Sequence, residues 1–383
     1  MRNICLAAIL LFLFWACNQK KSLKTAPELL STPEQESLSP VDTVSETQYL
    51  YTETYDRQKV QGVFKAGKDV FKAFTESFSL NDSSLTVTFP DSIDGKLTRV
   101  KKLKCHNHVY KIRLTRNGNL VYQRQFTKRD FLKFGDDGFI TESAPHAPTF
   151  RGVTADGRVL FDMWFCLPDS DFGGISFFAT NLQGDLLQVE SYSGTGGTGC
   201  DGQVHTSPNR RYFLSCEKLY GPNGYVFAFG KPDMVTAKFL TDTSFVALYN
   251  YVTRQYNKEE ATWEETYDDK SNNLLVYHVN GKVLAKYRFN GITHELDYTS
   301  NLEVLPGLGA LVLVDGEKQE IHQIPFAKPQ ESTVVRLGQL RQLTQRGKTP
   351  PGWQEVSMGH SLGEELFLYF AADSLSGYFL KKG

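Results

Sequence analysis

The feature that most constrains the fold is a recurring unit of two strand-like segments joined by a short turn. In each copy, apolar and β-branched residues favour a strand, and the turn contains Gly with Asn or Asp. These turn residues accept the positive φ angles that a tight, twisted hairpin requires. The chain is therefore predicted to consist mainly of antiparallel β-hairpins. Four close copies span residues 110–126, 175–190, 274–289 and 311–324, and two looser ones span 225–239 and 366–380.

The spacing of these units indicates how the hairpins are arranged. Their starts lie roughly 35–65 residues apart, and a four-stranded propeller blade needs about 40–50 residues. The segment Ser207–Arg211 is also similar to the Ser-Pro-Asp-Gly-Arg turn of many β-propeller blades. We therefore predict a mainly β, antiparallel fold with β-propeller-like repeats over most of residues 75–383. The alternative is two β-sandwich domains, which also have short strands with regular turns.

Three segments depart from the hairpin pattern. Residues 60–74 are predicted to form one short helix, because Val63, Val70 and Phe74 have helical spacing, although Gly62 and Gly67 weaken it. The charged insertion 253–272 is predicted to be a solvated loop or an extended hairpin. Residues 334–343 are predicted to be a short helix or an outer strand.

The first seventeen residues have the layout of a secretory signal. Arg2 precedes an apolar run of thirteen residues, 4–16, which at ~1.5 Å per residue is too short for a hydrocarbon core of ~30 Å. The segment Phe14–Cys17 resembles the lipobox of bacterial lipoproteins, which implies that Cys17 becomes the lipid-bearing first residue. The alternatives are an ordinary cleaved signal and an uncleaved anchor. We expect a cell-envelope lipoprotein, anchored in a lipid bilayer on the periplasmic or outer-membrane side.

Four regions follow from these patterns. Residues 1–17 are the predicted signal, and residues 18–56, rich in Ser, Thr, Pro, Glu and Gln, are a predicted disordered tether. A terminal strand at residues 48–55 is the alternative for the end of the tether. Residues 57–190 are a predicted N-terminal β-rich region. Residues 191–383 are a predicted C-terminal hairpin-repeat region, which could continue the same propeller.

Charge and cysteine content bear on three kinds of interaction: nucleic-acid binding, disulfide formation and metal binding. Lys and Arg number 42 and Asp and Glu 43, so the chain lacks the basic excess of nucleic-acid-binding domains. Beyond the signal, four cysteines allow disulfides in an oxidising compartment. Cys200 and Cys216 are the favoured pair, with buried free thiols as the alternative. The segment Cys105–His108 contains metal-ligand residue types, but no second ligand pair has zinc-site spacing, so neither metal nor cofactor is predicted.

About a third of the chain also has a family resemblance. It rests on Phe78–Ser84, on Asn117-Gly118 with Phe126–Phe131, and on Cys166–Gly173. Together these segments resemble an uncharacterised family of bacterial lipoproteins with β-rich domains. The resemblance implies a β-rich fold and no particular activity.

Residues 359–363 spell G-x-S-x-G, a motif typical of hydrolase nucleophiles. The motif requires Ser361 to lie on a strand-to-helix turn, with an acid and then a histidine downstream. Asp373 is a possible acid, but no histidine follows His360, and residues 366–370 favour a strand. We therefore predict a polar turn and no catalytic residue here. The alternative is a triad whose base lies upstream in the sequence, for which the candidates are His205, His278, His294 and His322.

Residues 194–199 spell G-x-G-x-x-G, but no helix is predicted after them to bind a dinucleotide phosphate. Glycines at this density permit close approach of the backbone to a ligand. This loop is therefore the candidate binding rim, with the candidate residues Gly194, Gly196, Gly197, Gly199 and Asp201. Together with Asp169 and Asp171, Asp201 could also provide a carboxylate pair for a glycosidase.

These features favour a non-catalytic binding or scaffolding module, because no supported catalytic constellation accompanies the repeat-built surface. Its expected partner is a protein or a glycan. The alternative is a hydrolase of envelope or glycan material that uses Ser361 or the loop acids. A third possibility is a structural envelope component without a ligand.

Overall fold

The structure is a computed structural model of the whole chain, 383 residues long. The predicted signal and Cys17 lie outside the described residues, as does most of the predicted tether. The structure describes residues 46–49, 56–93, 96–134, 139–167, 172–195, 204–215, 217–230, 234–257, 262–268, 270–290, 302–316, 318–347, 350–361, 364–372 and 374–382.

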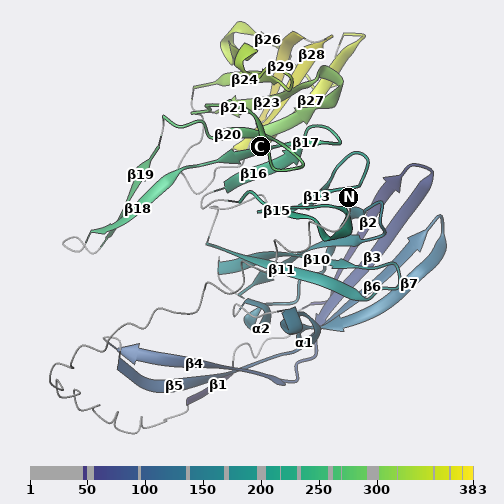
Figure 1. Cartoon of the computed structure of the whole chain (residues 1–383), viewed down its shortest axis with the longest axis vertical. Coiled ribbons are helices and arrows are strands. Elements are labelled where there is room, and N and C mark those ends of the chain that lie inside the picture. The colour runs from purple at the N-terminus through teal and green to yellow at the C-terminus, as the bar shows by residue number, and fades with distance from the viewer. Residues whose placement is uncertain are drawn as a thin grey trace, which may run out of the picture.

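The described residues form six four-stranded sheets, which we number sheet 1 to sheet 6 in chain order (Figure 1). Sheet 1 contains β2 (Gln58–Ala66), β3 (Asp69–Ser79), β6 (His108–Arg116) and β7 (Asn119–Thr127); sheet 2 contains β8 (Thr149–Val153), β9 (Val159–Cys166), β10 (Phe172–Thr180) and β11 (Leu186–Thr195); sheet 3 contains β12 (His205–Thr206), β13 (Phe213–Leu214), β14 (Lys218–Tyr220) and β15 (Val226–Ala228). Sheet 4 contains β16 (Met234–Phe239), β17 (Ser244–Tyr249), β20 (Leu274–His278) and β21 (Val283–Tyr287); sheet 5 contains β22 (Leu302–Leu305), β23 (Ala310–Asp315), β24 (Glu320–Pro325) and β25 (Thr333–Arg336); sheet 6 contains β26 (Arg341–Gln342), β27 (Trp353–Ser361), β28 (Glu364–Ala371) and β29 (Ser374–Lys382).

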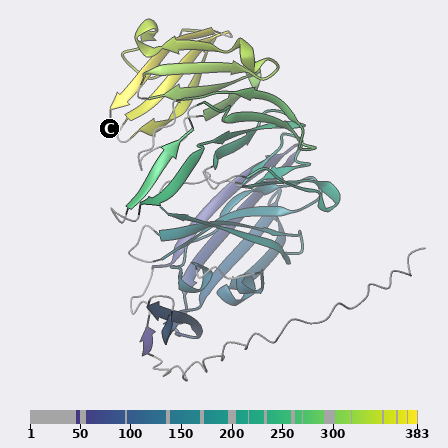
Figure 2. The ribbon, with the colours of Figure 1, turned by 60° about the vertical axis from the view of Figure 1, so that its left-hand side comes forward.

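Consecutive sheets pack face to face and follow one another along the long axis of the molecule (Figures 1 and 2). Along the inner edges of this stack, β2 contacts β8, β8 contacts β12, β12 contacts β16, and β22 contacts β27. The fold is therefore mainly β, antiparallel and propeller-like, which confirms the predicted fold class. Two sandwich domains do not describe it, because sheets 2 to 5 each pack against a neighbouring sheet on both faces.

The middle strands show why the sheets stack in this way. In β23, Leu311 and Leu313 belong to the cluster shared with sheet 4, whereas Val312 and Val314 belong to the cluster shared with sheet 6. Successive side chains of a strand point to opposite faces, so an unbroken apolar run is buried on both sides. Such runs in β17 and β23 thus connect one sheet interface to the next.

Sheet 6 ends the stack differently. Its strand order is β26-β29-β28-β27, so the first strand in sequence lies at the outer edge, where it pairs with β29 in parallel. On its far face, Phe367 and Tyr369 form a small cluster with residues of sheet 6 alone. Among the described residues, no hydrophobic cluster joins sheet 6 to sheet 1.

The predicted helix over residues 60–74 is wrong, because these residues form most of the β2–β3 hairpin. The turn includes Gly67 at φ 64°, a conformation that favours glycine. Buried and exposed side chains alternate along the middle of β3, with the period of a strand. Val63 and Phe74, which suggested helical spacing, are instead exposed at 54% and 42%.

Two other segments can be compared with their predictions. Residues 225–239 do not form the looser hairpin that was predicted, since β15 is the last strand of sheet 3 and β16 the first of sheet 4. The prediction failed because, in the sequence, a turn that connects two sheets looks the same as a turn within one hairpin. Residues 334–343 form outer strands, which was one of the two alternatives: β25 and β26 are separated by a single 3-10 turn.

Two insertions form arms that leave the stack. The first arm is β4 (Leu85–Ile93) with β5 (Lys96–Cys105), and β1 (Glu46–Tyr49) pairs with β5 in parallel. The second arm is β18 (Val252–Asn257) with β19 (Thr262–Tyr267), so the charged insertion is an extended hairpin. Each arm lies between the second and third strands of a sheet. Both project from the side of the stack that is on the left in Figure 1.

The helices of the described residues are short, and none has the length and hydrophobicity to span a membrane. Strand β1 lies within the predicted tether, so at residues 46–49 the structure has a strand where disorder was predicted; it pairs with the first arm and not with a sheet of the stack. The helices are α1 (Lys128–Phe131), η1 (Leu132–Phe134), α2 (Phe139–Glu142), η2 (Pro222–Gly224), η3 (Pro306–Leu308), η4 (Pro329–Glu331) and η5 (Leu337–Gln339).

Candidate functional site

A cavity of about 510 Å³ lies where the inner strands of several sheets converge. Its walls come from sheets 1, 3, 4 and 5, and we call it the central pocket. A volume of this size is within the range of small-molecule sites, about 300–1,000 Å³. The lining residues are Phe64, Lys65, Ala66 and Gly67 from sheet 1, His205, Thr206, Ser207, Pro208 and Arg210 from sheet 3, Lys238 and Phe239 from sheet 4, and Glu303 and Val304 from sheet 5.

The turn 207–211 brings Arg210 to the pocket. Arg210 has a φ of 61°, and its amide donates to the carbonyl of Ser207 at 2.8 Å, which closes the turn. The carbonyl of Arg210 accepts from the amide of Ala155 in sheet 2 at 2.8 Å. The amide of Asn209 donates to the carboxylate of Asp242 in sheet 4 at 2.6 Å. This turn is therefore tied to the corresponding turns of both neighbouring sheets.

The pocket has an excess of positive charge. Lys238 pairs with Glu303 at 3.4 Å and donates to the carbonyl of Leu302 at 2.6 Å, so its charge is largely neutralised. The Lys65 and Arg210 side chains form no ion pair with another described residue. The pKa of nearby Asp69 is lowered, first by hydrogen bonds from Arg116 and Asn117 and also by the charge of Arg210.

Two aromatic side chains, Phe64 and Phe239, provide apolar walls. Phe64 packs edge-on against Phe150 of β8, with ring centroids 6.3 Å apart. Its position depends on Gly152, where a Cβ atom would come within 2.8 Å of the Phe64 ring and where φ is 148°. Cationic groups beside aromatic walls suit an anionic ligand that also has an apolar part.

The sequence-predicted binding loop lies mostly outside the described residues. Gly194 is in β11, where it pairs with Gly173 of β10, but Gly196, Gly197, Gly199 and Asp201 are outside them. The next described element is strand β12. Cys200 and Cys216 are also outside, so their disulfide stays a prediction. Cys166 is a free thiol, and burial raises its pKa.

Ser361 does not have the backbone setting of a hydrolase nucleophile. It is the last residue of β27 and pairs with Glu364, the first residue of the antiparallel strand β28. A nucleophile elbow requires a strand followed by a helix in a parallel sheet. The strand predicted over residues 366–370 is thus present, and Asp373 lies outside the described residues.

The residues of the Cys105–His108 segment make local structural contacts. The Nδ1 atom of His106 accepts from the amide of Ser83 at 2.9 Å. The side-chain oxygen of Asn107 accepts from the amides of His108 and Lys128, at 3.0 and 3.2 Å. His108 is buried, and desolvation lowers its pKa to about 2.

Another group of described residues, Asp315, Glu320 and His322, has the composition of a metal site. None of the three lines the central pocket.

No protein family matches the chain, and no curated protein does. Solved structures give distant similarities. A protein of unknown function from Bacteroides caccae is 13% identical, with 60% of this chain and 78% of that chain covered and a TM-score of 0.24. A eukaryotic initiation factor structure is 10% identical (84% and 98% covered, TM-score 0.29). The β-propeller domain of the Trilobed protease from Pyrococcus furiosus is 12% identical (86% and 94% covered, TM-score 0.26). At such low TM-scores, these similarities support no conclusion about function.

Sequence reasoning had identified one part of the central pocket, the turn 207–211, but as a mark of a blade and not as part of a site. The other lining residues lie on four sheets, far apart in the sequence. Only the packing of the sheets brings them together.

Proposed function

We propose that this chain is an envelope-anchored, non-catalytic binding module, and that the central pocket holds a small anionic ligand with an apolar part. The observation that carries this proposal is the pair of cations, Lys65 and Arg210, beside the Phe64 and Phe239 walls. A guanidinium binds carboxylates and phosphates through two parallel hydrogen bonds, and an aromatic wall removes apolar ligand surface from water.

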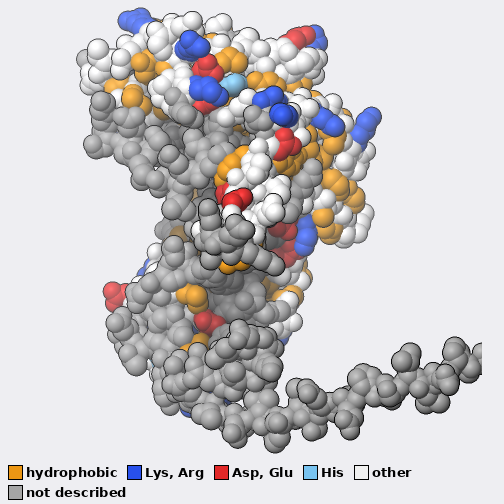
Figure 3. Space-filling model, turned by 90° about the vertical axis from the view of Figure 1, so that its left-hand side faces the viewer, with side chains coloured by type: hydrophobic (Ala, Val, Ile, Leu, Met, Phe, Trp, Pro, Cys, Tyr) orange, Lys and Arg blue, Asp and Glu red, His pale blue; other side chains and the backbone are white. Residues whose placement is uncertain are grey.

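The rigidity of the pocket rim supports binding. Backbone hydrogen bonds hold the turn that presents Arg210, and the pocket residues lie on or beside strands. Less conformational freedom is therefore lost when a ligand binds, which favours affinity. On the side from which the arms project, basic and acidic side chains are interspersed over the upper part of the molecule (Figure 3).

Binding of phenyl phosphate and benzoate, measured by isothermal titration calorimetry, tests this function. Both anions are expected to bind, whereas neutral benzyl alcohol is not. Arg210→Gln and Lys65→Gln should each weaken binding about tenfold or more, because a hydrogen bond to a charged group contributes about 1.5–3 kcal/mol. The affinity for both anions should also fall as salt is added, because salt screens the charges of Lys65 and Arg210.

Arg211→Gln is the matched control, because Arg211 is an exposed cation in the same turn that does not line the pocket. It should bind both anions as the wild-type protein does. If neither anion binds to the wild-type protein, or if Arg210→Gln and Lys65→Gln leave the affinity unchanged, the central pocket is not an anion site.

The proposed anchor has its own test, which starts from the full-length precursor in a bacterial host that processes lipoproteins. The mature protein is expected to begin at Cys17 and to carry acyl mass, as measured by intact mass spectrometry. More than one acyl chain is needed for stable attachment to a bilayer. Cys17→Ala should abolish lipidation, whereas Cys5→Ala should not, since Cys5 lies in the apolar part of the signal. A wild-type product with another N-terminus or without acyl mass contradicts the proposal.

A further inference from the structure

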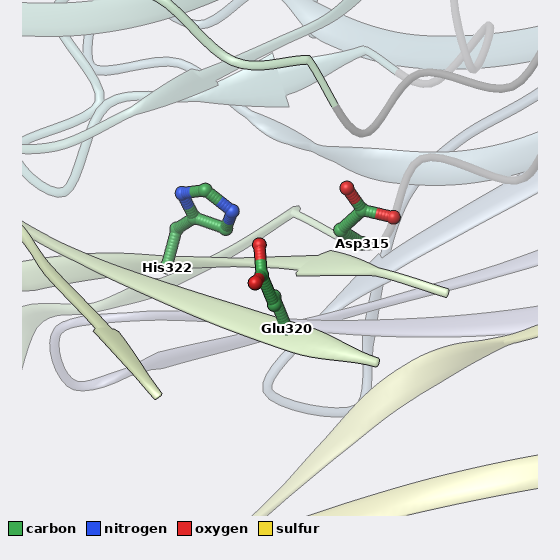
Figure 4. Close-up of side chains that lie close together, drawn as sticks. All are labelled: Asp315, Glu320 and His322. Carbon is green, nitrogen blue, oxygen red and sulfur yellow. The ribbon is translucent and has the colours of Figure 1, made fainter. Parts of the chain in front are cut away.

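Three potential metal ligands meet at one end of sheet 5. Asp315 is the last residue of β23 and Glu320 the first of β24, and the two are cross-strand partners. His322 lies two residues after Glu320, so both side chains point to the same face of the strand. Figure 4 shows the three side chains close together, and their ligand atoms lie within 4.8 Å of one another.

The imidazole of His322 is already oriented. Its Nδ1 atom hydrogen-bonds to the hydroxyl of Tyr287, on β21 of sheet 4, at 2.9 Å. The ring also packs edge-on against Phe289, with ring centroids 5.0 Å apart. Metal-binding histidines commonly use one ring nitrogen for such an orienting hydrogen bond and the other for the metal.

The other ring nitrogen of His322, Nε2, is buried and lacks a hydrogen-bond partner. In Figure 4, one nitrogen of the imidazole ring points toward the side chains of Glu320 and Asp315. Leaving a buried polar atom unsatisfied is unfavourable. Asp315 is also a buried carboxylate, 1% exposed. An ion bound between these groups would give the His322 nitrogen a partner and would have both carboxylates as ligands.

Both carboxylates already pair with exposed cationic side chains, which a bound metal ion would have to displace. Asp315 accepts from the amide of Lys318 at 3.0 Å and pairs with its ammonium at 3.2 Å, and Glu320 pairs with Arg336 at 3.3 Å. The two cationic side chains are 50% and 72% exposed, so they can turn into solvent. Only the cationic ends of these pairs are exposed, since the side chains of Asp315 and Glu320 are 2% and 19% exposed, so a bound cation would have to replace the charge of Lys318 beside Asp315.

We propose that Asp315, Glu320 and His322 bind a divalent transition-metal ion such as Zn²⁺. One imidazole nitrogen with two carboxylate oxygens is a ligand set that suits Zn²⁺, whereas Ca²⁺ and Mg²⁺ favour oxygen ligands alone. Zinc bonds of about 2.0–2.2 Å require the three groups to move slightly closer together. The half-buried Glu320 side chain can make this adjustment. The site links sheets 4 and 5 through Tyr287, and it is separate from the central pocket.

Equilibrium dialysis of the full chain against Zn²⁺ tests the site. The wild-type protein should bind Zn²⁺ at this site, with a rise in melting temperature. Glu320→Gln and His322→Gln should each weaken binding at least tenfold, and Tyr287→Phe should weaken it about tenfold by releasing the imidazole. Glu320→Gln keeps the test valid if His322→Gln does not fold, because Glu320 is partly exposed.

His278→Gln is the matched control. His278 ends the third strand of sheet 4 and accepts from the amide of Asn280, and it should not affect Zn²⁺ binding. X-ray absorption of the zinc-loaded protein should show nitrogen and oxygen ligands with one imidazole. Absence of binding to the wild-type protein, unchanged affinity in Glu320→Gln and His322→Gln, or a sulfur-ligated ion would each overturn the proposal.

Discussion

Replacing Phe178 with alanine is expected to lower the free energy of unfolding by about 3–5 kcal/mol, the usual cost of truncating a buried phenylalanine. Phe178 is 1% exposed and lies in the cluster between sheets 1 and 2. Its ring stacks on Phe161, with centroids 4.9 Å apart, and meets Phe131 of α1 edge-on at 5.2 Å. The substitution would leave a cavity at the centre of this interface.

Urea unfolding followed by intrinsic fluorescence measures the loss. Leu187→Ala is the control, because Leu187 lies on the neighbouring strand β11 and is 47% exposed. It should change the free energy of unfolding by no more than about 0.5 kcal/mol. Equal losses for Phe178→Ala and Leu187→Ala would mean that this cluster does not stabilise the fold as described.

Asp162→Ala is expected to have an effect of similar size, about 3–5 kcal/mol, because it leaves a partly buried charge without its partner. Asp162 of β9 is 4% exposed, and its carboxylate accepts from the Nε atom of Arg151 of β8. The same carboxylate accepts from the amide of Val204, just before sheet 3, at 3.0 Å. One side chain thus connects two strands of sheet 2 to the start of sheet 3.

Asp185→Ala provides the comparison, since Asp185 is a 62%-exposed acid that pairs with Arg124 at 3.6 Å. Its loss should cost at most about 1 kcal/mol. Asp162→Asn should fall between the two, because its amide oxygen can still accept from Val204. If Asp162→Ala costs no more than Asp185→Ala under the same denaturant conditions, the connection between sheets 2 and 3 has been assigned to the wrong residue.

The hairpins could be predicted because their turns have local requirements. Asn117 and Gly118 have φ angles of 51° and 85°, as a two-residue turn of this type demands. Because neighbouring residues fix that geometry, the hairpins β6–β7, β10–β11, β20–β21, β23–β24 and β28–β29 all occur where they were predicted. The mainly β class follows directly from them.

What the sequence could not provide is the assignment of strands to sheets. The segment 225–239 has the same pattern as a hairpin, yet its two strands belong to different sheets. Residues 60–74 have apolar side chains at helical spacing, but along β3 the buried side chains are Phe71, Ala73 and Thr75, which alternate. In both segments, packing between distant residues decided the outcome.

The candidate sites show the same limit. Apart from the turn 207–211, the residues of the central pocket give no local signal of a site, because the pocket forms only where four sheets meet. The cross-strand pair Asp315 and Glu320 could have been found in the predicted hairpin 311–324, with His322 two residues further on. The contribution of Tyr287 from the neighbouring sheet could not.

The two arms have a consequence for how this protein can vary. Because each arm replaces a connection between paired strands β3 and β6 or β17 and β20, the strands on either side keep their register whatever the length of the arm. Growth or loss of sequence there changes one side of the molecule and leaves the turns on the opposite side in place. The contacts that the arms make on one side could therefore diverge independently of what binds on the opposite side.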